Sequence, residues 1–214
     1  MNRFNPSVML ICAFVYSIFI SFNQIEVLFI TPLVFLMVCE YKRVIKVLKK
    51  LLFLNFFIAM IFVVLALQGN MEEAINVYIR TNMIILFNLL LFSSTNGFDI
   101  VRALNELRFP RQFVSSVYFT LKMIQTLNEE FKRIKYTLKA RGFCAGTSMF
   151  AYETYGNLFG HIFVKSIRKS NALRDSFLLR GFHGRIYLIN NNKLSLYDMI
   201  LFLVVNLIVI KTVV

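Results

Sequence analysis

The chain has little of the charge that soluble domains carry, because only 16% of its 214 residues are charged. Soluble proteins have about 25%. Acidic residues are scarcest, with 11 Asp and Glu against 24 Lys and Arg. Hydrophobic residues make up 58% of the chain and include 24 Phe. This composition excludes an ordinary soluble domain and indicates an integral membrane protein.

Three further shortages exclude functions. The chain has no phosphate-binding Gly-x-x-x-x-Gly-Lys-Ser/Thr sequence, so any ATPase must be another polypeptide. Its cysteines, Cys12, Cys39 and Cys144, have neither metal-ligand spacing nor the arrangement of a disulfide framework. The two histidines, His161 and His183, are too few for a metal-transport site. We therefore expect no enzyme activity, no cofactor and no metal site in this chain.

Apolar runs are abundant, and a helix that crosses a membrane needs about 20 largely apolar residues. Five runs are candidates, at residues 8–22, 27–39, 51–67, 74–92 and 194–210. The expected fold is all-α and polytopic, with about five transmembrane helices, four of them within residues 1–92 and one within 194–214.

The first two runs need closer attention. Residues 8–22 are interpreted as a retained span, because no small-x-small cleavage site of a secretory signal follows them. Residues 27–39 complete a predicted helical hairpin. This second span is short and contains Pro32, so we expect it to be either kinked or backed by protein rather than by lipid.

Basic residues predict the orientation. The connection at residues 40–50 holds five Lys and Arg, whereas the connections at 23–26 and 68–73 hold none. Connections rich in Lys and Arg stay on the cytoplasmic side. Counting spans from the 40–50 connection gives a cytoplasmic N-terminus and a cytoplasmic region over residues 93–193.

Residues 102–193 contain 16 of the 24 Lys and Arg but five of the 11 Asp and Glu. This charge favours contact with the anionic surface of a lipid bilayer. Nucleic acid is not an expected partner, because no recognised nucleic-acid-binding motif accompanies the charge.

Apolar residues in this region recur at helical spacing. The first series, at three- and four-residue steps, is Val117, Leu121, Ile124, Leu127, Phe131, Ile134 and Leu138. It predicts a long helix that starts after Pro110, a favoured residue at a helix opening, and stops at Gly142. A second amphipathic helix is predicted over residues 159–180, with its stop at Gly181.

Both predicted helices end in the tripeptide Arg-Gly-Phe, at residues 141–143 and 180–182. One interpretation is a simple helix stop, since Arg in the last turn favours the helix dipole by about 0.3–1 kcal/mol and Gly is the commonest residue after it. The other is a pair of docking tips, because a guanidinium binds carboxylates in a two-pronged geometry that Lys does not reproduce. The repetition favours docking.

Two cytoplasmic helices that each end in an Ala-Arg-Gly-like motif resemble the transmembrane T component of energy-coupling factor (ECF) transporters, the CbiQ/EcfT family. Ala140-Arg141-Gly142 fits the motif in full, and Leu179-Arg180-Gly181 departs from it at the small first residue. Three other stretches agree with the family pattern: Arg80 in a span that ends at Ser93-Ser94-Thr95, ALNELRFP at 103–110, and Glu129-Glu130 in the long helix.

The resemblance implies a coupling role without chemistry. T components of this family bind two ABC ATPase subunits through the ends of two coupling helices, and they hold a substrate-binding S component in the bacterial plasma membrane. Arg141 and Arg180 would be the docking cations, and Gly142 and Gly181 would allow a close fit. The transported substrate would be a vitamin such as biotin or a metal ion such as cobalt or nickel.

Three alternative functions remain. A polytopic membrane enzyme would need clustered His, Asp or Glu at facing depths, and the predicted spans lack them. A permease subunit of a conventional ABC transporter would dock through one loop of the Glu-Ala-Ala type, and the chain has no such sequence. A polybasic membrane scaffold without an ATPase would keep the basic charge but would not need paired helix tips.

Four ionisable residues carry further predictions. Arg80 and Asp198 are expected to extend to the membrane interface. For Arg80 the alternative is a structural brace or a contact with the S component. Pro110, at the start of the long helix, is a second candidate for a structural role or for a contact with the S component. Glu129 and Glu130 are predicted to pair with Arg133, one turn along the same helix.

Overall fold

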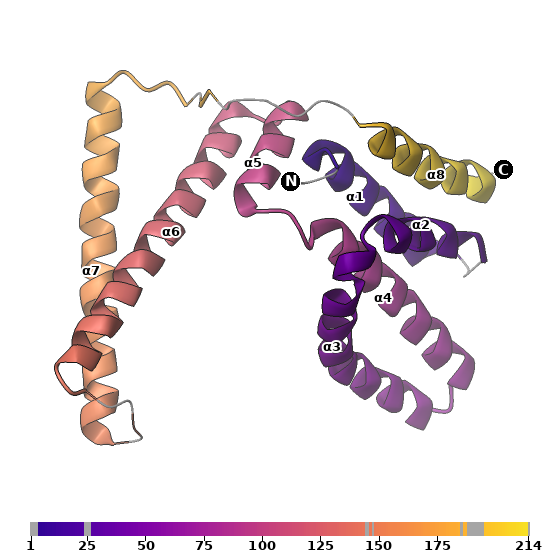
Figure 1. The fold of residues 1–214 in the computed structure, drawn as a ribbon, viewed down its shortest axis with the longest axis horizontal. Coiled ribbons are helices and arrows are strands. Elements are labelled where there is room, and N and C mark those ends of the chain that lie inside the picture. The colour runs from indigo at the N-terminus through magenta and orange to yellow at the C-terminus, as the bar shows by residue number, and fades with distance from the viewer. Residues whose placement is uncertain are drawn as a thin grey trace. The chain divides into compact units, whose positions relative to one another are not determined.

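The computed structural model describes residues 4–23, 27–143, 146, 148–184, 186–187 and 195–213. Every element within these ranges is helical (Figure 1), which confirms the all-α prediction. Residues 24–26 of the first predicted connection, and Cys144, lie outside this part of the chain. The elements in chain order are α1 (Pro6–Phe22), the 3-10 turn η1 (Val27–Ile30), α2 (Thr31–Cys39), α3 (Tyr41–Leu67), α4 (Met71–Phe92), α5 (Gly97–Glu106), α6 (Arg111–Ala140), α7 (Met149–Leu179) and α8 (Leu196–Val213).

The chain packs as two compact units. The first contains residues 1–107 together with 189–214, and the second contains residues 108–188. Helix α5 therefore packs with the apolar helices, although the predicted cytoplasmic region starts at residue 93. Packing and sidedness are separate properties, so the topological division into residues 1–92, 93–193 and 194–214 stays a prediction.

The core of the first unit forms where one face of α1 meets α2, α4 and α8. This face is at most 2% exposed at Met9, Cys12, Tyr16 and Ile20, which follow one another at helical spacing. The ring of Tyr16 stacks on Phe87 of α4, with centroids 4.0 Å apart. Its hydroxyl donates to the carbonyl oxygen of Phe29 at 2.9 Å, so the buried phenol has a polar partner.

Helices α3 and α4 pack against each other as a hairpin that turns at Gly69, where φ is +87°. Within the described residues they are the two helices long and apolar enough to cross a membrane. Helix α3 leaves a broad apolar surface open, since Leu52, Phe53 and Phe56 are each at least 74% exposed. An apolar surface of this extent requires hydrocarbon or a partner protein around it.

The remaining predicted spans are shorter helices. Helix α1 has 17 residues. Helix α2 has nine, because the first four residues of the predicted span, Val27–Ile30, form the 3-10 turn η1 instead. Pro32 lies in the first turn of α2, where its missing N–H is not needed. It is buried together with Leu33 and Leu36, so protein backs one face of α2, whereas Val34 and Val38 on another face are at least 51% exposed.

Asp198 fastens the N-terminal segment to α8. Its carboxylate accepts backbone N–H groups from Asn5 and from Ser195, each at 2.8 Å, and the residue is 1% exposed. A buried carboxylate needs such donors to offset its desolvation. The prediction that Asp198 extends to the membrane interface is therefore wrong.

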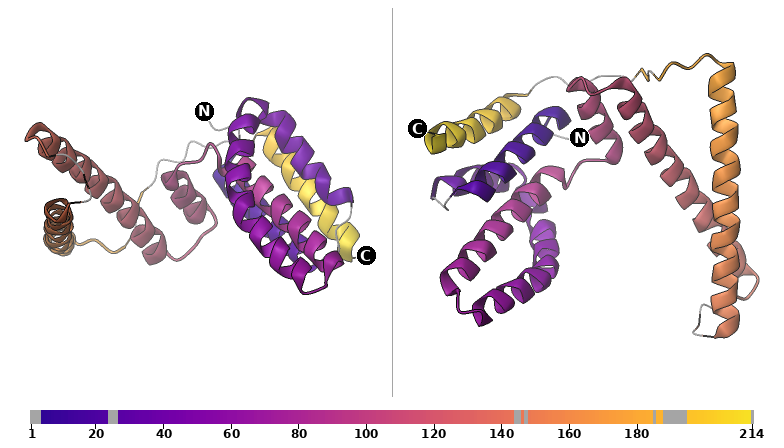
Figure 2. Two further views of the ribbon diagram at one scale, coloured as in Figure 1. Left: turned by 90° about the horizontal axis from the view of Figure 1, so that it is seen from below. Right: turned by 180° about the vertical axis from the view of Figure 1, so that it is seen from behind.

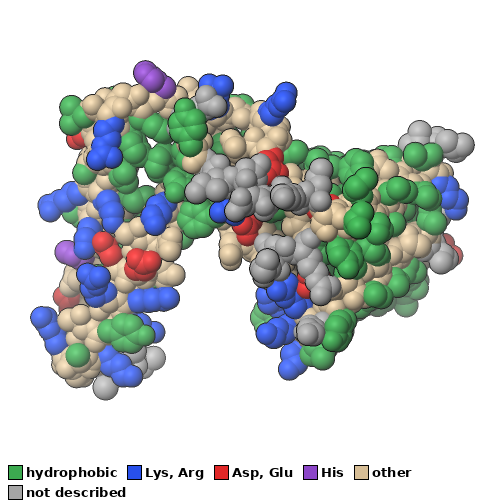
Figure 3. Space-filling model, turned by 45° about the horizontal axis from the view of Figure 1, so that its top comes forward, with side chains coloured by type: hydrophobic (Ala, Val, Ile, Leu, Met, Phe, Trp, Pro, Cys, Tyr) green, Lys and Arg blue, Asp and Glu red, His purple; other side chains and the backbone are tan. Residues whose placement is uncertain are grey.

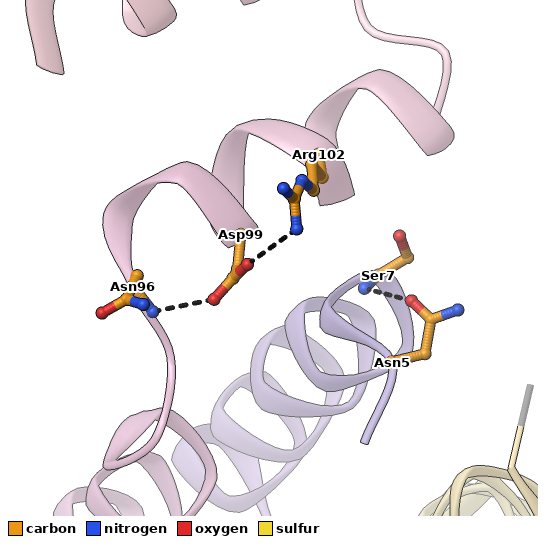
Figure 4. Close-up of polar contacts among 5 residues, drawn as sticks. All are labelled: Asn5, Ser7, Asn96, Asp99 and Arg102. Carbon is orange, nitrogen blue, oxygen red and sulfur yellow. Dashed lines mark hydrogen bonds and ion pairs between the residues drawn. The ribbon is translucent and has the colours of Figure 1, made fainter. Parts of the chain in front are cut away.

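Four further polar contacts involve the first turn of α1 and the two ends of α5 (Figure 4). The side chain of Asn5 caps α1 by accepting the backbone N–H of Ser7 at 3.1 Å, and the Ser7 hydroxyl donates to Glu106 of α5. At the start of α5, Asp99 accepts the backbone N–H of Asn96 at 3.0 Å and pairs with Arg102 at 3.3 Å. Side chains thus satisfy the first turns of both helices.

Replacing Asp198 with Ala should lower the thermal unfolding midpoint of the detergent-solubilised protein. The change leaves the buried N–H of Asn5 without an acceptor, which costs about 1–3 kcal/mol, and the part-buried N–H of Ser195 adds a smaller cost. Asn206→Ala is the matched control in the same helix, because the Asn206 amide donates to its own helix at Phe202. Equal midpoints for the two variants would contradict this role of Asp198.

Candidate functional site

The first Arg-Gly-Phe sequence closes α6 with two specific backbone hydrogen bonds. Arg141 is the C-cap residue, and Gly142 adopts φ +78°, a conformation that favours glycine. The N–H of Phe143 donates to Leu138 at 3.0 Å, and the N–H of Gly142 donates to Lys139 at 3.1 Å. This pair of bonds is the Schellman motif, which ends a helix and satisfies its last carbonyl groups.

The second sequence closes α7 in the same way. Arg180 is the C-cap and Gly181 has φ +62°. Phe182 donates to the carbonyl oxygen of Phe177 at 3.0 Å, and Gly181 donates to that of Leu178 at 3.2 Å. Both helix stops predicted from the sequence are confirmed, and the repeated tripeptide builds the same local structure twice.

The phenylalanine of each tripeptide packs against aromatic rings of the helix pair. The ring centroid of Phe143 lies 5.8 Å from that of Tyr155 in α7. The ring of Phe182 lies 4.9 Å from Phe177 at the end of α7 and 5.8 Å from Phe119 near the start of α6. These contacts hold each tip at a place where the two helices meet, and sequence reasoning did not anticipate them.

The contacts also define the direction of the pair. The end of α6 meets the beginning of α7, and the end of α7 meets the third turn of α6, so the helices are antiparallel (Figures 1 and 2). Helices of 30 and 31 residues are each about 45 Å long at 1.5 Å per residue. Arg141 and Arg180 therefore lie at opposite ends of the pair.

Both arginines are exposed, as are the residues before them, Ala140 and Leu179. Leu179 is 89% exposed. Within the described residues neither guanidinium forms a hydrogen bond or ion pair. Each tip thus presents a cation beside an open apolar or small side chain.

A groove lies beside each tip within the helix pair. The groove next to Gly142 has a volume of about 570 Å³ and includes Leu138, Phe143 and Tyr155. The one next to the second tip has about 640 Å³ and includes Phe119, Phe177 and Phe182. Figure 3 shows Lys and Arg side chains spread along this pair, with few acidic ones among them.

Glu130 of α6 forms ion pairs that connect α6 to α7. Its carboxylate lies 3.3 Å from the ammonium of Lys165 and 3.8 Å from that of Lys169, both in α7. Its second oxygen is buried without a hydrogen bond to any described residue. The prediction that Glu130 pairs with Arg133 is wrong, because the facing helix brings two lysines within reach.

Arg80 braces the first unit. Its guanidinium donates to the carbonyl oxygen of Asn23 at 3.0 Å, which ties α4 to the residue that caps the end of α1. Its Nε is buried without a partner in the described part of the chain. Of the three interpretations of Arg80, the structural brace agrees with this contact.

The starts of the two long helices were predicted with different success. Helix α6 begins directly after Pro110, as expected. Helix α7 begins at Met149 rather than at residue 159. Its true start had a sequence signal, because Ser148 is an N-cap whose hydroxyl accepts the N–H of Ala151 at 3.2 Å.

No metal site is formed by the described residues, where no group of three or more His, Cys, Asp or Glu side chains is placed to hold an ion. What the arrangement offers is surface recognition. Two identical cationic tips close an antiparallel helix pair, and a separate unit carries helices that suit a membrane.

These features define a helical membrane protein in which an antiparallel pair of long helices carries an Arg-Gly-Phe sequence at each helix end. The chain belongs to the CbiQ family: the family model, described as cobalt transport protein, matches residues 1–188. This match confirms the resemblance inferred from the two motifs, and it identifies the chain as a membrane component of a transport system. The comparison with curated proteins gives no match.

Replacing Gly142 with Ala should loosen the end of α6. No atom lies within 4 Å of the added methyl group, so the effect comes from the positive φ alone, at about 1–2 kcal/mol. Hydrogen exchange at the amide of Phe143 should rise about fivefold or more. Gly156→Ala in the interior of α7 is the control, because it also meets open space but gains helix propensity, and its exchange should slow. Unchanged exchange in Gly142→Ala would refute the motif's dependence on glycine.

Proposed function

We propose that this protein is the transmembrane coupling (T) subunit of an ECF-type ABC importer. In this role it links ATP hydrolysis by two partner ATPases to uptake of a substrate through a separate S component in the membrane. The observation that carries the proposal is the pair of identical Arg-Gly-Phe tips at opposite ends of one antiparallel helix pair.

The tips suit two separate docking sites. A guanidinium at a helix end binds a carboxylate in a fixed, two-pronged geometry. Arg141 and Arg180 have no partner among the described residues, so both are available to an acidic groove. Their placement at opposite ends of helices about 45 Å long suits two ATPase subunits side by side rather than one.

The helix pair also offers a route for motion. When ATP binding and hydrolysis change the spacing of the ATPases, each tip moves with its partner, and the pair changes its arrangement. Such coupling requires two discrete arrangements, each favoured by one state of the partners. The ion pairs of Glu130 with α7 lie between the two tips along α6 and constrain how the helices slide past each other.

This chain takes no chemical step in the proposed cycle and needs no cofactor. The cargo is selected by the S component, and the family description favours cobalt over a vitamin such as biotin. The proposed location is a bacterial plasma membrane. The basic connection at residues 40–50 supports an orientation with the N-terminus and the α6–α7 pair on the cytoplasmic side.

The proposal is tested by affinity co-purification from native membranes, scored for a bound ABC ATPase. Arg141→Glu and Arg180→Glu, singly and together, should reduce the recovered ATPase, and the double variant should lose it by about tenfold or more because a like charge replaces each docking cation. The Arg180 variant should have the smaller effect, since Leu179 departs from the motif.

Arg133→Glu combined with Arg168→Glu is the matched control. Both residues are exposed on the same two helices but away from the tips, and the change in charge is identical. Membrane insertion is measured for every variant. ATPase that remains bound to the double variant, or is lost equally from the control, would reduce the tips to helix stops and remove the main support for the proposal.

A further inference from the structure

A second surface, at the junction of α2 and α3, plays no part in the proposed coupling. Here an apolar groove of about 550 Å³ opens on the first unit, lined by Val34, Met37, Val38, Tyr41, Val44 and Ile45. Val38 is 70% exposed and Ile45 is 67% exposed, so the groove is open on its outer side. We call this feature the α2–α3 groove.

The first turns of α3 are amphipathic around this groove. Tyr41, Val44 and Ile45 line it. Lys46, Lys49 and Lys50 occupy the neighbouring face and are exposed. Lys49 lies one helical turn after Ile45, which makes the two side chains neighbours on the helix surface.

The positive charges of these lysines are not balanced by acidic side chains of the described residues. Within the described residues Lys46, Lys49 and Lys50 form no ion pair. The nearby acid, Glu40, is already paired with Arg43 at 3.1 Å. The groove therefore has unpaired positive charge on one border and apolar side chains inside.

The position along α3 places this charge at the edge of the hydrocarbon. The helix continues without a break from the lysines into residues 51–67, an apolar stretch about 25 Å long at 1.5 Å per residue. Its outer side chains are exposed. Lysines that precede such a stretch lie where lipid phosphates lie. An apolar face bordered by lysines is typical of a helix segment that lies in the interface of a bilayer, with its apolar side chains against the acyl chains.

We propose that the α2–α3 groove binds one anionic phospholipid, with an acyl chain along Val38 and Ile45 and the headgroup phosphate at Lys46 and Lys49. A soluble anion would leave the groove empty, and an apolar peptide would leave the lysines unpaired. A phospholipid satisfies both halves of the surface. The site adds a lipid requirement that is independent of ATPase docking.

The chain has no Trp, which permits a direct test with the full-length protein in vesicles. A single Trp is introduced by Ile45→Trp in the groove, and in a separate variant by Phe57→Trp, a 60% exposed position further along α3. Quenching of each Trp is compared for brominated phosphatidylglycerol and brominated phosphatidylcholine at equal mole fraction. The ratio gives the preference for the anionic lipid at each position.

Phosphatidylglycerol should be preferred about fivefold or more at position 45 and about equally with phosphatidylcholine at position 57, since each basic residue near the lipid surface contributes about a fivefold attraction. Lys46→Gln with Lys49→Gln should remove the preference at position 45. Lys132→Gln with Lys135→Gln in α6 removes the same charge elsewhere and should leave it intact.

Three results would overturn the site. They are no preference at position 45, an equal preference at both positions, which would indicate general attraction to the surface, or a preference that survives loss of both lysines. If the lysine variant does not insert, the comparison of the two Trp positions with all lysines present still decides the question. ATPase co-purification is a separate readout, so failure of either proposal leaves the other standing.

Discussion

Hydrocarbon offers no hydrogen-bond partner to a peptide group, and that constraint governs this chain. Every described element is a helix, so backbone groups are paired within their own segment. Helix ends leave backbone N–H and C=O groups without partners in the helix, and there polar side chains supply the missing hydrogen bonds. Asp198 accepts two backbone N–H groups, Asn5 caps α1, and Arg80 donates to the carbonyl oxygen of Asn23. Two of the few charged side chains in the first unit, Asp198 and Arg80, thus pair with backbone groups at helix ends.

The second unit meets the same requirement by backbone geometry. Gly142 and Gly181 adopt positive φ, and the Schellman bonds of Phe143 and Phe182 close the helices. The arginines at the C-cap then need no structural partner. In a coupling subunit this division is useful, because the fold of each tip does not rely on the side chain that is proposed to bind.

Features set by local sequence were predictable. Helical spacing, Pro110 and the two glycines located α6 and the ends of both long helices, since each signal acts within a few residues of the chain. Features set by packing were not. The lysines that pair with Glu130 lie 35 and 39 positions away, and Asn5 lies 193 positions from Asp198. The spacing of residues within one helix does not show which side chains of another helix pack against it.

The closed helix ends have one more consequence. A helix C-terminus carries a partial negative charge on its unpaired carbonyl groups, which repels an acidic surface. At each tip two of those carbonyl oxygens, of Leu138 and Lys139 or of Phe177 and Leu178, already accept backbone bonds. A partner that approaches with carboxylates therefore meets the guanidinium with less repulsion from the helix end, so the glycine turn that ends the helix also favours an anion beside the arginine.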